Sequence, residues 1–126
     1  MAKPKVLGID YGHKAQPVRD MWRDEARGGL PAKKRLAKAK LKSLSTFETR
    51  AMVNPLTAGP PVEHDRWPGD LARDYGPEIP NLMRFELADR WRGCFSLIGE
   101  PGGCRVWVLY LWDHEEYSRK SGYSKK

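Results

Sequence analysis

The chain has 126 residues, which is enough for one domain with a single core and too few for two of ordinary size. Lysine and arginine number 23 against 16 acidic residues, which gives a formal net charge of +7. This surplus favours nucleic acid, an anionic membrane surface or an acidic protein as partner, although a basic surface that serves only solubility is the simpler alternative. No apolar run approaches the ~18 residues that span a bilayer, and the start lacks a signal-peptide core, so we expect a cytoplasmic protein.

The first half of the chain predicts a strand followed by two helices. Residues 5–11 are apolar enough for a short strand. Pro17 suits the first turn of a helix, which Gly28 and Gly29 end, and Pro31 begins a second helix. Apolar residues recur at helical spacing in both segments, which predicts a helical hairpin. These residues are Val18, Met21, Trp22 and Ala26 in the first helix, and Leu36, Ala37, Leu41, Leu44, Phe47 and Ala51 in the second.

The second helix also carries a cationic run that includes Lys33, Lys34, Lys38 and Lys40. A run of this kind is most often a solvated helix face. It is also what a surface that contacts RNA or the ribosome requires, because phosphate groups attract lysine side chains. Both interpretations stay open at the level of sequence, with Lys33, Lys34 and Lys38 as the candidate RNA contacts.

Residues 54–80 form a long connection that is rich in proline. Long loops in compact domains are often functional or disordered. Trp67, Leu71 and Tyr75 are spaced so that they could hold this segment against the core as a short helical turn.

The last third predicts an antiparallel sheet. Residues 82–87 alternate as a strand, with Arg84 and Glu86 on one face. Residues 91–98 and 104–112 form a hairpin around a loop at 99–103. This register places Ile98 opposite Cys104, so that Trp91, Phe95 and Leu97 share the core face with Trp107, Leu109 and Leu111. It also places Cys94 and Cys104 too far apart for a disulfide, and we expect two reduced, buried cysteines.

The opposite face of this hairpin carries charged and aromatic residues together. Arg90 and Arg92 lie on it, with Trp112 opposite Arg90 and Tyr110 opposite Arg92 in the predicted register. Arginine beside aromatic rings can bind phosphate and stack on bases, although ordinary surface cation–π contacts have the same composition.

A short tail follows the last strand. Asp113 is placed to cap a helical turn, with Glu116 three residues on as in a capping box. His114 and Tyr117 then share one side of that turn. Histidine titrates near neutrality and tyrosine can donate a proton, so acid–base chemistry fits this pair better than metal binding does.

These residues resemble the RelE/ParE superfamily of toxins from toxin–antitoxin systems. The resemblance covers about 45 residues and is carried by Leu87, Trp91-Arg92, the apolar strands at 94–98 and 106–111, His114-Glu-Glu-Tyr117 and the closing Gly122-Tyr123. It implies an α+β fold in a single domain over 1–126, with an N-terminal strand and a helical hairpin packed on a curved antiparallel sheet.

The activity that the resemblance implies is ribosome-dependent cleavage of mRNA, in which a 2′-OH attacks the adjacent phosphate without a metal or other cofactor. Arg92 would stabilise the phosphate in the transition state, His114 would act as acid or base, and Glu86 would be a candidate base. Arg84 lies on the strand that supplies charged catalytic residues in relatives. Tyr117 and Tyr123 would stack or donate protons, and the implied RNA contacts are Arg90, Tyr110, Trp112, Arg119 and Lys120.

The same resemblance implies a cognate antitoxin that covers the basic face, and mRNA in the ribosomal A site as substrate. Some relatives instead inhibit DNA gyrase without cleaving RNA. A basic RNA-binding module without catalytic activity is a further alternative, supported by the lysine-rich helix and the aromatic residues.

Overall fold

The computed structural model describes residues 4–120 and shows an α+β fold, as the sequence predicts. Within these residues, four helices and four strands follow one another with three single turns of 3₁₀ helix between them. The strands are β1 (Val6–Tyr11), β2 (Met83–Glu86), β3 (Arg92–Glu100) and β4 (Gly103–Trp112). The helices are α1 (Gln16–Gly28), α2 (Pro31–Val53), α3 (Leu71–Tyr75) and α4 (His114–Lys120), and the 3₁₀ turns are η1 (Pro55–Thr57), η2 (His64–Arg66) and η3 (Ala88–Arg90).

The strands form one sheet in the order β1-β4-β3-β2. The pairs β2–β3 and β3–β4 are antiparallel, whereas β1, at the edge opposite β2, runs parallel to β4. The antiparallel sheet predicted for the last third is present as β2–β3–β4, and the N-terminal strand adds a parallel edge, so the whole sheet is mixed. A parallel pair needs a long connection, and here the helical hairpin, the proline-rich segment and β2–β3 all lie between the two strands.

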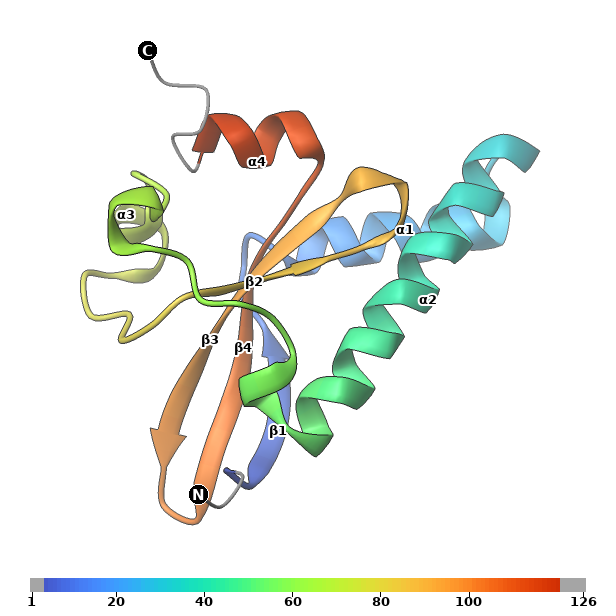
Figure 1. The fold of residues 1–126 in the computed structure, drawn as a ribbon. Coiled ribbons are helices and arrows are strands. Elements are labelled where there is room, and N and C mark those ends of the chain that lie inside the picture. Colours follow the sequence, from blue (N-terminus) through green and yellow to red (C-terminus); the bar gives the residue numbers. More distant parts are fainter. Residues whose placement is uncertain (1–3, 121–126) are drawn as a thin grey trace.

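Helices cover both faces of the sheet (Figure 1). α1 and α2 pack on one face around Trp22, Leu44 and Phe47. α3 and α4 lie on the other face, where Leu71 and Tyr117 are buried. The predicted apolar spacing of the helical hairpin is confirmed for most positions, whereas Met21 and Leu36 are exposed. No helix within residues 4–120 is long and apolar enough to cross a membrane.

The hairpin of β3 and β4 turns more tightly than the sequence suggests. Pro101 and Gly102 form a two-residue turn, with Gly102 at a φ of 89° that favours glycine. Both strands therefore extend to the turn, and Ile98 pairs with Arg105 instead of Cys104. A shift of one residue moves the side chains of one strand to the other face of the sheet.

The core face of β4 changes as a consequence. Val106 and Val108 face α1 and α2, whereas Trp107 and Leu109 join the cluster under α3 and α4. The register also shifts between Cys94 and Phe95, which leaves Leu109 as the extra residue of a bulge. Both cysteines are free and buried, as predicted.

The proline-rich connection packs against the sheet. The three residues expected to hold it, Trp67, Leu71 and Tyr75, belong to the same hydrophobic cluster as residues of β3 and β4. Leu71 is buried, the indole N–H of Trp67 donates to the Val62 carbonyl at 3.0 Å, and the Tyr75 hydroxyl donates to the Leu109 carbonyl at 2.6 Å. The segment therefore extends the core on the α4 side of the sheet.

Gly93 gives a direct test of the contact between β2 and β3. A Cβ atom added at this position would lie 2.1 Å from Cζ of Phe85, whose ring stacks on Phe47 at 3.7 Å in the core. We expect Gly93→Ala to lower the free energy of unfolding by about 1–3 kcal/mol, the usual cost of overpacking. Gly28→Ala is the control, because a Cβ there meets nothing within 4 Å. Equal urea midpoints for both variants would contradict the packing described here.

Candidate active site

A small hollow lies where β2 ends, β3 begins and α4 starts. Its volume is about 170 Å³, and its lining residues are Glu86, Leu87, Arg90, Trp91, Arg92 and His114. Four of these six were candidate site residues from the sequence: a carboxylate, two guanidinium groups and an imidazole. The structure therefore brings His114, which follows β3 and β4, back to Glu86, Arg90 and Arg92, which are near neighbours in the sequence.

Arg92 has neighbours on β2, on β4 and on α4. Glu86 is its cross-strand neighbour, and the Nη2 atom of Arg92 lies 4.0 Å from the Glu86 carboxylate. The guanidinium carbon lies 5.0 Å from the centre of the Tyr117 ring, a cation–π distance. Trp112 is its partner on β4, so the predicted pairing of Arg92 with Tyr110 is wrong. The tight turn and the bulge at Leu109 each shift the register by one residue. The result is a half-buried cation with a defined position.

His114 is the first residue of α4, and the cap of this helix sets its place. The backbone N–H of Glu116 donates to Oδ1 of Asp113 at 2.8 Å, as the predicted cap requires. The carboxylate of Glu116 pairs with Arg119 instead of completing a capping box. One turn along, Tyr117 is buried at 1% exposure among residues of β3 and β4. This anchor holds His114 over the hollow.

The buried position of Tyr117 changes the role expected for it. Its ring lies below Arg92 and is covered by the sheet, so it supports the guanidinium and does not offer a face for stacking on a base. What remains open at the hollow is the Glu86 side chain, which is 71% exposed, together with Arg92 and His114. A carboxylate, an imidazole and a fixed guanidinium can remove one proton, supply another and stabilise an oxyanion between them.

The turn that precedes β3 is strained in a way that the sequence did not indicate. Asp89 and Arg90 have φ values of 60° and 62°, a conformation that residues other than glycine seldom adopt. Two contacts from α2 hold this turn. The Ala88 N–H donates to Oγ of Ser43 at 3.0 Å, and the Lys40 ammonium lies 4.0 Å from Oδ2 of Asp89. Arg90 is thereby presented to the hollow.

Lys40 is a residue whose role sequence reasoning missed. It was placed in the solvated cationic run, but it is 8% exposed and lies between Trp22 and Trp91, at 5.3 Å and 4.9 Å from their ring centres. The signal was present, because Lys40 follows Ala37 by three residues and precedes Leu44 by four, inside the apolar stripe of α2.

The remaining basic candidates lie outside the hollow. Lys33, Lys34 and Lys38 belong to the N-terminal half of α2, which Figure 1 shows extending away from the sheet and from α4. Lys120 donates to Oδ2 of Asp70 at 2.8 Å, and this contact holds the pKa of Asp70 below its usual value. Tyr123 lies outside the described residues.

Tyr110 and Trp112 form a stacked pair on β4, with ring centres 4.1 Å apart. Tyr110 is 2% exposed and its hydroxyl donates to Oδ2 of Asp74 at 2.6 Å. The prediction that Tyr110 stacks on RNA is therefore wrong in geometric terms, because the ring has no open face and instead ties α3 to the sheet. Trp112 is half-buried and retains some exposure.

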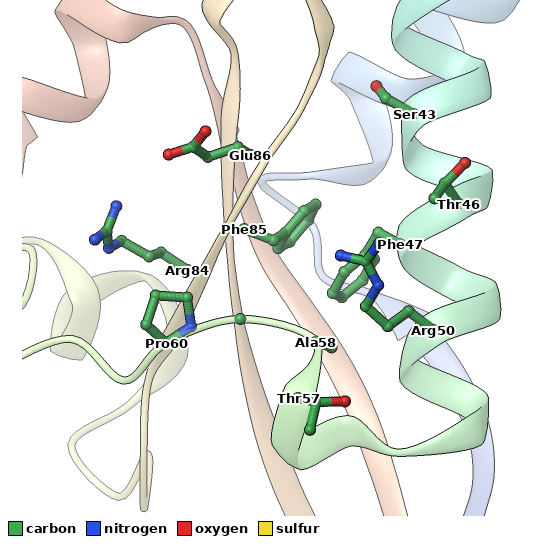
Figure 2. Close-up of a pocket in the computed structure, with 11 residues that line it drawn as sticks. Ser43, Thr46, Phe47, Arg50, Thr57, Ala58, Pro60, Arg84, Phe85 and Glu86 are labelled. Carbon is green, nitrogen blue, oxygen red and sulfur yellow. The ribbon is translucent and has the colours of Figure 1, made fainter.

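Arg84 lies two residues before Glu86 on β2 and leaves the strand on the same side (Figure 2). It lines a larger groove next to the hollow and does not line the hollow itself. Within residues 4–120, no three histidine, cysteine, aspartate or glutamate side chains are grouped so that they could hold a metal ion.

Comparison with known proteins adds no assignment to this geometry. No protein-family model matches the chain, and no curated protein matches it.

One buried tyrosine, Tyr110, and two half-buried ones, Tyr11 and Tyr75, predict that the fold loses stability at alkaline pH. Burial raises the pKa of Tyr75 to about 12, and burial with a carboxylate hydrogen bond raises the pKa values of Tyr11 and Tyr110 further. Above pH ~10 the unfolded chain loses these protons while the folded protein keeps them, so stability is complete below that pH and falls as pH rises.

The test is urea unfolding from pH 8 to 11 for the wild type and Tyr110→Phe. At pH 8 the variant should lose about 1–2 kcal/mol with its hydrogen bond to Asp74. Above pH ~10 its stability should decline less steeply than that of the wild type, because one of the titrating groups is gone. Parallel declines for the two proteins would contradict this assignment.

Proposed function

We propose that this protein is a RelE-like toxin that cleaves mRNA on the ribosome and so stops translation. The observation that carries the proposal is the hollow in which Glu86, Arg92 and His114 meet. These three groups are the ones that an attack of a ribose 2′-OH on its neighbouring phosphate needs: a base, a cation and an acid. The surplus of positive charge at the hollow and over the whole chain supports a polyanionic substrate.

In this mechanism Glu86 takes the proton of the 2′-OH, because its carboxylate can accept a proton and is open to a substrate. The 2′-oxygen then forms a bond to phosphorus while the bond to the 5′-oxygen breaks. Arg92, fixed between Glu86 and Tyr117, stabilises the negative charge that builds on the phosphoryl oxygens. His114 gives a proton to the leaving 5′-oxygen. The products are a 2′,3′-cyclic phosphate and a 5′-hydroxyl end.

The proposal includes a protein partner and a location. An acidic antitoxin segment that covered the hollow would neutralise Arg90 and Arg92 and block RNA from the site. The toxin would act in the cytoplasm, where ribosomes translate. A gyrase-inhibiting toxin and an RNA-binding module without catalysis are the alternatives that the test below separates.

The test is induction of the protein in growing cells, with primer extension on ribosome-bound mRNA to map cuts. The wild type should arrest growth and cut mRNA. His114→Ala and Arg92→Ala should each reduce cleavage by roughly 100-fold or more, the usual effect of removing a general acid or a donor that stabilises an oxyanion. Neither change should prevent folding, because neither side chain is fully buried.

Two controls match these variants. His64→Ala removes an exposed histidine of η2, and Arg27→Ala removes an exposed arginine of α1 that pairs with Asp24. Both should cut like the wild type. If induced wild-type protein leaves mRNA intact, the proposal fails. DNA damage signalling would then indicate a gyrase inhibitor, and salt-sensitive RNA binding without cuts would indicate a binding module.

A further inference from the structure

A second, larger groove opens beside the hollow, between the C-terminal half of α2 and the edge strand β2 (Figure 2). Its volume is about 470 Å³, within the ~300–1,000 Å³ that is usual for small-ligand sites. Its lining includes Thr46, Phe47, Arg50, Thr57, Arg84 and Phe85. Glu86 lines both this groove and the hollow, so the two are neighbours on one surface.

The charge of the groove favours an anion. Arg50 and Arg84 line it, and no ion pair of the described residues involves either of them. Glu86 is the acidic residue of the lining, and its carboxylate already lies 4.0 Å from Arg92. Figure 2 shows the Arg50 guanidinium turned from α2 toward β2, beside Phe47. A groove arginine that forms no ion pair is available for a phosphate.

The rest of the groove suits the remainder of a nucleotide. Phe47 and Phe85 stack on each other between α2 and β2, with a ring-centre distance of 3.7 Å, and supply an apolar floor. Thr46 and Thr57 use their hydroxyl protons on the carbonyls of Lys42 and Asn54. Their oxygens can still accept a hydrogen bond, which ribose hydroxyls and base amino groups can donate.

We propose that this groove binds the nucleotide of the substrate RNA next to the bond that is cut, with Arg50 contacting its phosphate. The inference rests on the proposed function, because the shared residue Glu86 links the groove to the hollow. It adds a binding site for a flanking nucleotide and assigns Arg50 a role in substrate affinity. An acidic peptide is the competing occupant, and the test distinguishes the two.

The test measures binding without cleavage. A short single-stranded oligoribonucleotide with 2′-O-methyl groups cannot be cut, because the attacking hydroxyl is blocked. Titrated into isotope-labelled protein, it should shift the backbone amide signals of Thr46, Arg50 and Gly59 in the groove, together with those of Arg90 and His114 at the hollow. Its dissociation constant and the dependence of that constant on salt are measured by fluorescence anisotropy.

Arg50→Gln should weaken this binding roughly tenfold and lower the slope of log affinity against log salt by about 0.7, the share of one phosphate contact on a single strand. Thr46→Phe should weaken binding by filling the groove, with the charge unchanged. Arg27→Gln is the control and should bind like the wild type. Arg50 is exposed and has no acidic partner among residues 4–120, so its replacement leaves the fold intact.

The two proposals can fail separately. If the groove signals do not move, or Arg50→Gln binds like Arg27→Gln, the groove inference is wrong even where mRNA is cut. If mRNA stays intact while the groove signals move and Arg50→Gln weakens binding, the cleavage proposal fails and the RNA site stands. An acidic peptide is titrated in parallel as the competing occupant. If Arg50→Gln loses binding to this peptide while its RNA binding is unchanged, the groove inference is overturned in favour of the peptide.

Discussion

The docking of α4 on the sheet is the constraint on which the candidate active site depends. Asp113 determines where this helix begins, and Tyr117 determines where it lies, because its ring is buried against β3 and β4. The same ring supports the guanidinium of Arg92 from below. One buried aromatic side chain therefore determines the position of the Arg92 guanidinium and, one helical turn away, that of the His114 imidazole.

The edge strand β2 joins the core to the site. Phe85 points from it toward α2 and stacks on Phe47, whereas Arg84 and Glu86 leave it on the other side (Figure 2). Because side chains alternate along a strand, the four residues of β2 supply both a core residue and the charged residues of the site. Phe85 is packed between Phe47 and the backbone of Gly93. This packing fixes the backbone from which the Glu86 side chain extends.

A buried cation performs a similar task at the turn that precedes β3. Lys40 lies between two tryptophan rings and faces Asp89, the first of two residues in a left-handed turn. Such a turn persists only where its surroundings hold it. The helical hairpin therefore does more than cover the sheet, because α2 also positions Arg90.

Much of the fold and part of the site follow from local pattern. The apolar spacing of Trp22 in α1 and of Ala37, Leu44 and Phe47 in α2 predicted the helical hairpin and its buried side, and Asp113 predicted the start of α4. The ends of β3 and β4 and the register between them could not be predicted in this way, since the composition of residues 99–103 allows turns of different length. The two-residue turn at Pro101 and Gly102 moved Trp107 and Leu109 to the other face.

The sequence by itself determined which residue types are present and which helices and strands they form, because these depend on neighbours within a few positions. Only the tertiary structure decided which side chains stay open. Tyr110 and Lys40 find their polar partners Asp74 and Asp89 at 36 and 49 residues along the chain, and Arg50 lies in a groove whose other wall is β2. Contacts over such distances along the chain depend on how the whole core packs, and no local pattern encodes them.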